Sequence, residues 1–110
     1  MTVYLANAFS LSMLVPPTSI RVTEVTVDDV KRVVAQGFVS AIGHDATAKI
    51  ISTRLGVQVP VNRVAIQLKP GDLLLVFQLL TRLPEGKVLN EEEMKQVAAK
   101  WFLVTTQGGE

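Results

Sequence analysis

Apolar and polar residues alternate in several short stretches of the chain, and this spacing is typical of β-strands. Residues 2–6 form a short run of this kind, and residues 20–26 alternate and are rich in β-branched side chains. In residues 62–69 every second side chain is apolar and falls on one face. Residues 73–80 are almost continuously apolar, which indicates a strand covered on both sides, and residues 101–106 predict a last strand.

Three helices are predicted from apolar residues spaced three or four apart and from capping residues. The first begins after Thr26, with an acidic residue three positions later, and runs to about residue 35. The second occupies residues 45–55, directly after His44. The third begins after Asn90 in the same manner as the first and runs to about residue 100.

The resulting order of elements, β-β-α-α-β-β-α-β, predicts an α/β fold. We expect a single domain over residues 1–110. Its central mixed β-sheet should have about five strands flanked by helices. The Pro70-Gly71 turn predicts a hairpin, which would supply an antiparallel pair between the strands on either side of it.

The composition narrows the range of functions. Eleven basic and ten acidic side chains leave a net charge of +1, far from the strongly basic balance of a duplex-binding protein, so no duplex DNA is expected as a partner. The chain has no cysteine and a single histidine, which excludes disulfides and thiolate sites and predicts no metal site within one subunit. No signal-peptide pattern and no apolar run of roughly 20 residues is visible. We therefore expect no membrane association and a cytoplasmic location.

His44 is the strongest chemical candidate, because it lies between Gly43 and the predicted helix 45–55. Unpaired backbone N–H groups and the positive end of a helix dipole meet at such a position. They form a ready site for an anion, and phosphate suits it best. A bound phosphate favours the protonated imidazole, so His44 can gain its proton when the substrate arrives. The alternative is that His44 is only a capping or surface residue.

Other polar side chains lie at or beyond the ends of predicted strands. Asn7 and Ser10 follow the first strand, where loops of α/β proteins carry ligands; alternatively, both satisfy the backbone of their own turn. Gln78 is the only polar residue of the apolar run 73–80. We expect it to be buried in a central strand, so its side chain must hydrogen-bond a ligand or a neighbouring loop.

Arg82 and Glu85 follow the apolar run and are three residues apart. They are either a surface ion pair, worth little, or part of a metal-free phosphodiesterase set with His44. Phosphoryl transfer needs an acid for the leaving oxygen and a cation for the charge that develops on phosphorus. These three residue types can supply both.

Three runs of the sequence resemble a known family. YLANAFS occupies residues 4–10, IGHDAT occupies residues 42–47, and RLPEGKVL occupies residues 82–89. Together, in collinear order over nearly the whole chain, they resemble the viral type III anti-CRISPR ring nucleases. This is a family of small proteins of archaeal viruses that is also found in some bacterial phages and bacteria.

The resemblance implies a homodimer that binds cyclic tetra-adenylate, the second messenger made by type III CRISPR complexes. By cutting the ring, such a protein switches off the defence nucleases that the messenger activates. The resemblance implies a reaction without metal or cofactor, in which a ribose 2′-hydroxyl of the ligand attacks its own adjacent phosphate. The product is linear di-adenylate with a 2′,3′-cyclic phosphate end.

The resemblance also implies roles for individual residues. His44 matches the catalytic histidine that donates a proton to the departing 5′-oxygen, Glu85 the acid that orients it, and Arg82 the arginine that contacts phosphate. Five further residues match ligand-contacting or pocket-lining positions: Asn7, Ser10, Thr47, Arg63 and Gln78. The chain departs from the family pattern at Ser12, where many relatives carry asparagine, and at Ala46, where serine is common. We expect these two departures to change affinity rather than chemistry.

Other classes of function are compatible with the same residues. One is a dimeric binding module that sequesters a cyclic nucleotide without cutting it, and another is a small DNA-binding regulator. The near-neutral charge and the lack of a helix-turn-helix pattern argue against the regulator. In an interaction protein, by contrast, all of these polar residues would serve as caps and turns.

Overall fold

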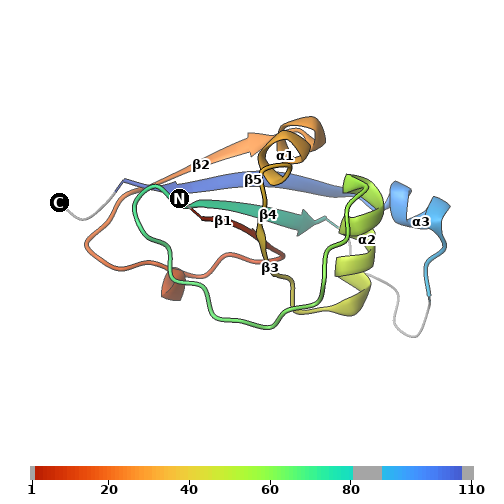
Figure 1. The fold of residues 1–110 in the computed structure, drawn as a ribbon, viewed down its shortest axis with the longest axis horizontal. Helices are drawn as coiled ribbons and strands as arrows, with labels where there is room; N and C mark the ends of the chain where they lie inside the picture. The colour runs from red at the N-terminus through yellow and green to blue at the C-terminus, as the bar shows by residue number, and fades with distance from the viewer. Residues whose placement is uncertain (1, 81–87, 108–110) are drawn as a thin grey trace.

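A five-stranded mixed sheet forms the centre of the molecule (Figure 1), which confirms the predicted α/β class. The computed structural model describes residues 2–80 and 88–107. None of the helices in this part of the chain has the length and apolar character needed to cross a bilayer. The elements in chain order are β1 (Val3–Ala6), a short 3-10 helix η1 (Leu11–Met13), β2 (Ile20–Val25), α1 (Val27–Val34), β3 (Val39–Ala41), α2 (Asp45–Leu55), β4 (Leu73–Leu79), α3 (Glu91–Gln96) and β5 (Ala99–Thr106).

The strand order across the sheet is β2-β5-β4-β1-β3. β1 pairs in parallel with both β3 and β4, so Leu5 lies opposite Ser40 on one side and opposite Leu75 on the other. β5 pairs antiparallel with β4 and with β2. Because β1, β3 and β4 run in the same direction, their carboxyl ends lie at the same edge of the sheet.

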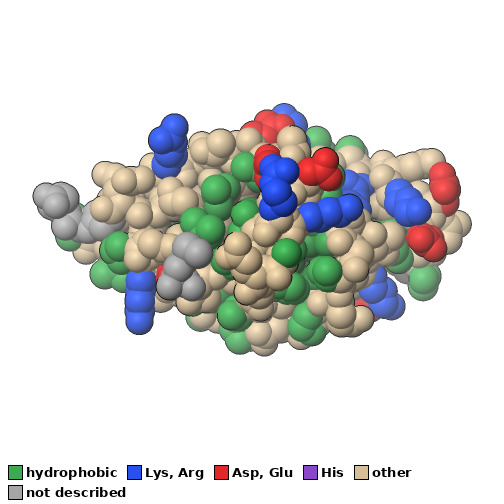
Figure 2. Space-filling model, turned by 45° about the horizontal axis from the view of Figure 1, so that its top comes forward, with side chains coloured by type: hydrophobic (Ala, Val, Ile, Leu, Met, Phe, Trp, Pro, Cys, Tyr) green, Lys and Arg blue, Asp and Glu red, His purple; other side chains and the backbone are tan. Residues whose placement is uncertain are grey.

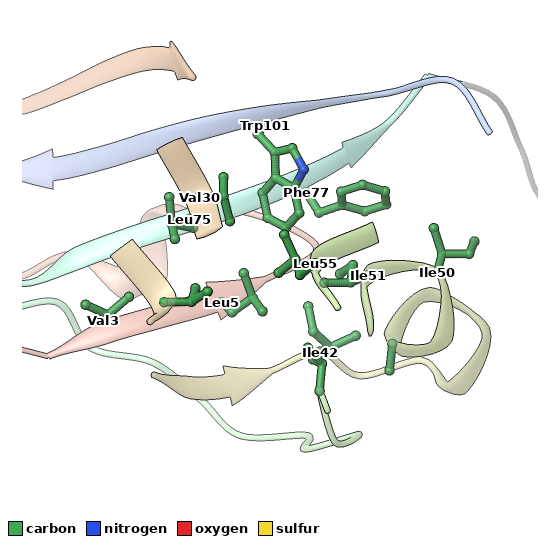
Figure 3. Close-up of a cluster of buried hydrophobic side chains, with 13 residues drawn as sticks. Val3, Leu5, Val30, Ile42, Ile50, Ile51, Leu55, Leu75, Phe77 and Trp101 are labelled. Atoms are coloured by element: carbon green, nitrogen blue, oxygen red, sulfur yellow. The ribbon is translucent and has the colours of Figure 1, made fainter. Parts of the chain in front are cut away.

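Each face of the sheet has its own core. On the helix-bearing face, Leu5 and Phe77 of the sheet share a buried cluster with Val30 of α1 and Ile51 of α2 (Figure 3). Burial of such a cluster removes apolar surface from water and is the main force that holds the helices on this face. The α2 helix, which begins beside His44, is therefore anchored by its apolar side.

On the opposite face, extended chain takes the place of helices. The segment between α2 and β4, drawn in green in Figure 1, contributes Ile66 and Leu68 to a second cluster with Leu74 and Val76 of β4. Successive residues of β4 thus enter different cores, because neighbouring side chains of a strand point to opposite faces. This confirms the prediction of a strand covered on both sides.

The predicted strand at residues 62–69 is wrong, because this segment forms no regular strand. The hairpin expected at Pro70-Gly71 is therefore also absent, and the antiparallel pairs of the sheet are those made by β5. The alternation that suggested a strand has another cause: Ile66 and Leu68 are buried against the sheet face while their neighbours are exposed. The fifth strand is β3, in residues predicted only to lead toward His44.

Both predicted capping boxes are formed. Thr26 Oγ1 accepts a hydrogen bond from the Asp29 N–H at 3.1 Å, and the Asp29 carboxylate accepts one from the Thr26 N–H at 3.0 Å. Asn90 begins α3 in the same way. This last helix is shorter than predicted, because the backbone of Val97 is extended (φ −62°, ψ 128°). The chain then turns directly into β5, which begins at Ala99 instead of residue 101.

The α1 capping box should make the stability of the protein depend on pH. Hydrogen bonds from Thr26 and the nearby Arg32 guanidinium lower the pKa of Asp29. The stability that this carboxylate contributes is complete above the pKa of an aspartate in the unfolded chain, about 3.9, and is lost as the pH falls through the lower pKa of the folded chain. We therefore expect Asp29→Ala to lower the thermal unfolding midpoint more at neutral pH than at about pH 2.

Circular dichroism melts of wild type and variant at the two pH values measure this difference. Asp28→Ala is the matched control, since Asp28 also lies in the first turn of α1 but is not part of the capping box. Equal losses for Asp29→Ala at both pH values would contradict the assignment of a stabilised carboxylate.

Candidate functional site

The parallel strands bring the residues that follow β1 and β3 to one edge of the sheet. Asn7 follows β1, while Gly43 and His44 follow β3 and lead into α2. An open hollow of about 390 Å³ lies at this edge, and its lining residues are Asn7, Ala41, Gly43, His44, Arg63 and Val64. Three of the residues predicted to form a site, Asn7, His44 and Arg63, are therefore brought together although they are far apart in the sequence.

His44 is the N-cap residue of α2, as the sequence predicts. Its backbone is extended (φ −128°, ψ 131°), and its carbonyl accepts the Ala48 N–H at 3.0 Å. The imidazole is exposed and makes no capping hydrogen bond. Asp45, the acidic residue of the first turn, lies 3.1 Å from the Lys49 ammonium. The His44 side chain is thus not used to cap α2, and it is accessible to a group bound at the helix start.

Arg63 contributes a cation beside His44. Its Nε donates a hydrogen bond to the Gly43 carbonyl at 2.8 Å. A Cβ at Gly43 would lie 3.5 Å from Arg63 Cγ, so the Arg63 side chain passes directly beside Gly43. This bond engages one of the five N–H groups of the guanidinium. The rest of the fork is the part that can contact an anion, and guanidinium is the cation that matches phosphate geometry best.

Asn7 connects the end of β1 to the same turn. Its amide oxygen accepts the Gly43 N–H at a long distance of 3.5 Å. The side chain therefore contacts the neighbouring turn rather than the backbone of its own turn. An amide with a weak contact of this kind can rearrange toward a ligand at little cost.

Ser10 fits the simpler of its two interpretations. Its hydroxyl accepts the Ser12 N–H at 3.3 Å and lies 3.0 Å from the Ser12 hydroxyl, so it caps η1. It is exposed and is not among the residues that line the hollow. Ser12 is one of the two departures from the family pattern, and its hydroxyl is thus a hydrogen-bond partner of the Ser10 hydroxyl.

Thr47 and Gln78 also lie outside the lining of the hollow. Thr47 is 4% exposed and forms part of the buried side of α2. The expectation of a buried Gln78 is wrong: its side chain is exposed, and its amide donates to the adjacent Leu79 carbonyl at 3.0 Å. This follows from its place near the end of β4, beyond the part of that strand that both cores cover.

Arg82 and Glu85 lie outside the described residues. The described chain on either side of them is tied to other elements. Before them, the Leu80 N–H donates to the Ala98 carbonyl at 2.9 Å. After them, Asn90 caps α3.

Two polar residues beside the hollow are not among those predicted from the sequence. Ser40 in β3 is 5% exposed, and its hydroxyl donates to the Pro60 carbonyl at 2.6 Å. The Asn62 side chain donates to the Ser40 carbonyl at 2.7 Å. The only sequence signal was a polar residue at Ser40 within an otherwise apolar run, and its partners are about 20 residues away, so local patterns could not identify them.

A larger hollow, of about 520 Å³, is lined by residues of β2, α1, α2, α3 and β5 and contains none of the predicted site residues. Its three cations have partners within the protein: Lys100 lies 3.6 Å from Glu24, Lys95 lies 3.6 Å from Glu91, and Arg54 donates to carbonyls of α3. Charges of both signs are interspersed over the face seen in Figure 2. Within the described residues there is no group of three or more acidic or histidine side chains that could hold a metal ion. The hollow at His44 is therefore the better candidate for an anion site.

The fold and this hollow define a small α/β domain with a polar site at the carboxyl ends of its parallel strands. The chain belongs to the STIV B116-like family, whose model matches residues 3–101. The solved structure of B116 of Sulfolobus turreted icosahedral virus superimposes with a TM-score of 0.81 and 34% identity, covering 96% of this chain and 99% of that one.

The chain is also similar to small proteins of archaeal viruses and of a bacterium. Uncharacterized protein 26 of Sulfolobus islandicus filamentous virus is 42% identical over 76% of this chain and 73% of its own length. Uncharacterized protein ORF117 of Acidianus two-tailed virus is 35% identical over 92% and 90% of the two chains. A bacterial relative, YddF of Bacillus subtilis, is 26% identical over 89% and 94%. The predicted kinship with small archaeal-virus proteins is confirmed at the level of the family.

Proposed function

We propose that this protein is a metal-independent ring nuclease that binds cyclic tetra-adenylate and cleaves it to linear di-adenylate with a 2′,3′-cyclic phosphate end. Such an activity would neutralise type III CRISPR signalling in the host cytoplasm. The observation that carries the proposal is the position of His44. Its exposed imidazole stands at the start of α2, in one hollow with Arg63 and Asn7.

The hollow suits a phosphodiester for two independent reasons. The first turn of an α-helix presents backbone N–H groups and a positive dipole end to an anion. Arg63, held at Gly43 by a bond of 2.8 Å, adds a charged donor next to them. Asn7 lines the same hollow and offers an amide to the ligand. A phosphate bound here would lie beside the His44 side chain.

In the proposed reaction the ligand supplies its own nucleophile. The ribose 2′-oxygen forms a bond to phosphorus, its proton passes to solvent, and the bond from phosphorus to the 5′-oxygen breaks. His44 donates a proton to that leaving oxygen. No water is consumed, which leaves the 2′,3′-cyclic phosphate. Donors beside the phosphate stabilise the charge that develops there, and their contribution is largest in the transition state.

The residues outside the described part and outside the hollow keep their proposed roles from the family resemblance. Arg82 would contact the reacting phosphate, and Glu85 would orient His44. Ser10, Thr47 and Gln78 would contact the ligand, which for Ser10 requires hydrogen bonds other than those to Ser12 and for Thr47 requires exposure of a side chain that is buried in the structure.

We further propose that the protein acts as a homodimer. A ring of four identical nucleotides can share a two-fold axis with a symmetric dimer. Each subunit would then present its His44 to one of two opposite phosphates. Cleavage at both would halve the ring into two equal products.

The proposed function predicts cleavage in the presence of excess chelator. Incubation with radiolabelled cyclic tetra-adenylate should yield linear di-adenylate with a cyclic phosphate end, and sedimentation should give the mass of a dimer. A ring in which the 2′-hydroxyls are replaced by hydrogen is the matched control, because it should bind and remain intact. A folded dimer that binds the natural ring but leaves it uncut would instead be a sequestering module. A protein that binds no cyclic oligoadenylate would be an interaction protein.

A further inference from the structure

We propose that Asn62 is a positioning residue, which with Ser40 places the Arg63 guanidinium at the start of α2. The inference rests on the ring-nuclease function proposed above, since it concerns the affinity of the same hollow for its phosphodiester. Neither Asn62 nor Ser40 lines that hollow. Both would act on the ligand only through Arg63.

The segment that carries Arg63 has little structure of its own. Between the end of α2 and the start of β4 the described chain forms no regular helix or strand, and its only β-bridge there is the isolated parallel one between Ile42 and Val61. Backbone outside regular elements is held mainly by side-chain contacts and is the most easily displaced part of a fold. The position of Arg63 therefore depends on a few identifiable bonds.

Three hydrogen bonds attach this segment to β3, which is an edge strand of the sheet, and to Ile42, the residue directly after it. The Ser40 hydroxyl donates to the Pro60 carbonyl at 2.6 Å, and the Asn62 side-chain amide donates to the Ser40 carbonyl at 2.7 Å. The Asn62 backbone N–H donates to the Ile42 carbonyl at 2.8 Å. The segment thus occupies polar groups of an edge that would otherwise lack a strand partner.

The two side-chain bonds differ from the backbone bond in what they control. The bond from the Asn62 N–H keeps the chain near Ile42 whatever side chain residue 62 carries. The Asn62 amide adds a second attachment one residue before Arg63, which sets the direction in which the Arg63 stem leaves the backbone. From there Arg63 Nε reaches the Gly43 carbonyl at 2.8 Å. The consecutive residues Asn62 and Arg63 therefore both bind carbonyl groups of the segment from Ser40 to Gly43. His44 follows this segment directly.

Loss of the Asn62 amide should loosen Arg63 without removing any group of the hollow. We expect Asn62→Ala to weaken binding of cyclic tetra-adenylate by about 3- to 10-fold, the range of one hydrogen bond. Cleavage of the bound ring should also slow, since Arg63 is one of the donors that stabilise the phosphate charge in the transition state, while His44 itself remains at the start of α2. Gln67→Ala is the matched control, since Gln67 is an exposed amide of the same segment.

A double-mutant cycle separates positioning from general weakening of the fold. Binding is measured in a His44→Asn background, so that the ring remains intact, for Asn62→Ala, Arg63→Ala and the double variant. If Asn62 acts through Arg63, Asn62→Ala should have no further effect on affinity once Arg63 is alanine. Thermal unfolding of each variant is also measured. The loss of stability from Asn62→Ala should be the same whether residue 63 is arginine or alanine.

A ligand-free measurement tests the placement of Arg63 even if the ring-nuclease proposal fails. In proton–nitrogen spectra, the Arg63 Nε–H should exchange slowly in wild type and become fast in Asn62→Ala, but not in Gln67→Ala. An unchanged Arg63 signal, or an equal loss of affinity in both backgrounds of the cycle, would overturn the positioning role. Failure of wild type to bind the ring, with the exchange result as expected, would overturn the proposed ligand alone.

Discussion

Replacing His44 by asparagine is expected to slow cleavage of cyclic tetra-adenylate by about 10²–10⁴-fold, the usual contribution of one positioned general acid. Binding should be nearly unchanged, because the first N–H groups of α2 and the Arg63 guanidinium remain. Single-turnover cleavage with enzyme in excess measures the chemical step, and equilibrium binding of the 2′-deoxy ring measures affinity without turnover.

Asparagine is a sharper replacement than alanine at this position. His44 is the N-cap of α2 and makes no capping hydrogen bond with its side chain, whereas asparagine is among the best N-cap residues. His44→Asn should therefore keep or raise the stability of α2 while removing the only imidazole of the chain. If the variant is fully folded but cleaves the ring slowly, the loss of activity lies in the chemical step. Cleavage at the wild-type rate would show that the proton for the 5′-oxygen comes from elsewhere.

The starts of the three helices and the end of α2 were predictable because their signals are local, whereas the predicted end of α3 was about four residues too late. Thr26 and Asn90 each bond to a residue three positions later, and that distance can be read directly from the sequence. Gly56 ends α2 in the left-handed conformation (φ 70°), which few residues other than glycine adopt. The same locality allowed His44 to be placed at a helix start.

The errors in predicting strands arose because burial of alternate side chains and pairing into a sheet produce the same sequence pattern. Ile66 and Leu68 alternate with exposed residues because they cover a face of the sheet, whereas a strand would have required ladder pairing with a neighbouring strand, which this segment does not make. Conversely, β3 pairs with β1 over only three residues, too few to show a period. The periodicity of a sequence indicates which side chains are buried. Whether the segment also forms a β-ladder depends on the presence of a neighbouring strand.

The composition of the hollow could be only partly predicted for a related reason. Asn7 and His44 follow strands whose parallel arrangement brings them to one edge, so their proximity follows from the topology. Arg63 reaches the same edge through contacts of Asn62 with Ser40, which are separated by 22 positions. A pattern of residue types contains no information about such a pairing. The family resemblance pointed to Arg63, but the reason for its position became visible only in the fold.

The largest loss of stability is expected for Phe77→Ala, at about 3–5 kcal/mol, since removal of a buried aromatic ring loses its transfer free energy and leaves a cavity. Phe77 is fully buried, and its ring centroid lies 4.9 Å from that of Trp101. Urea unfolding of wild type and variant measures the loss. Phe102→Ala is the matched control, because this ring belongs to the other face of the sheet and is only partly buried, so a smaller loss is expected.

Phe77 also supports a cation that holds α3. The Arg54 guanidinium lies 5.6 Å from the centre of the Phe77 ring, and burial lowers the pKa of this arginine. Its N–H groups donate to the Met94 and Val97 carbonyls at the end of α3, where the helix leaves carbonyls without intrahelical partners. Phe77→Ala should therefore increase amide exchange in α3 more than in α1. Arg54 and His44 lie at opposite ends of α2. Phe77→Ala should therefore lower the stability of the protein, while the molecules that remain folded keep the proposed activity at His44. A loss below about 1 kcal/mol, the level of an ordinary substitution, would contradict a well-packed core at this position.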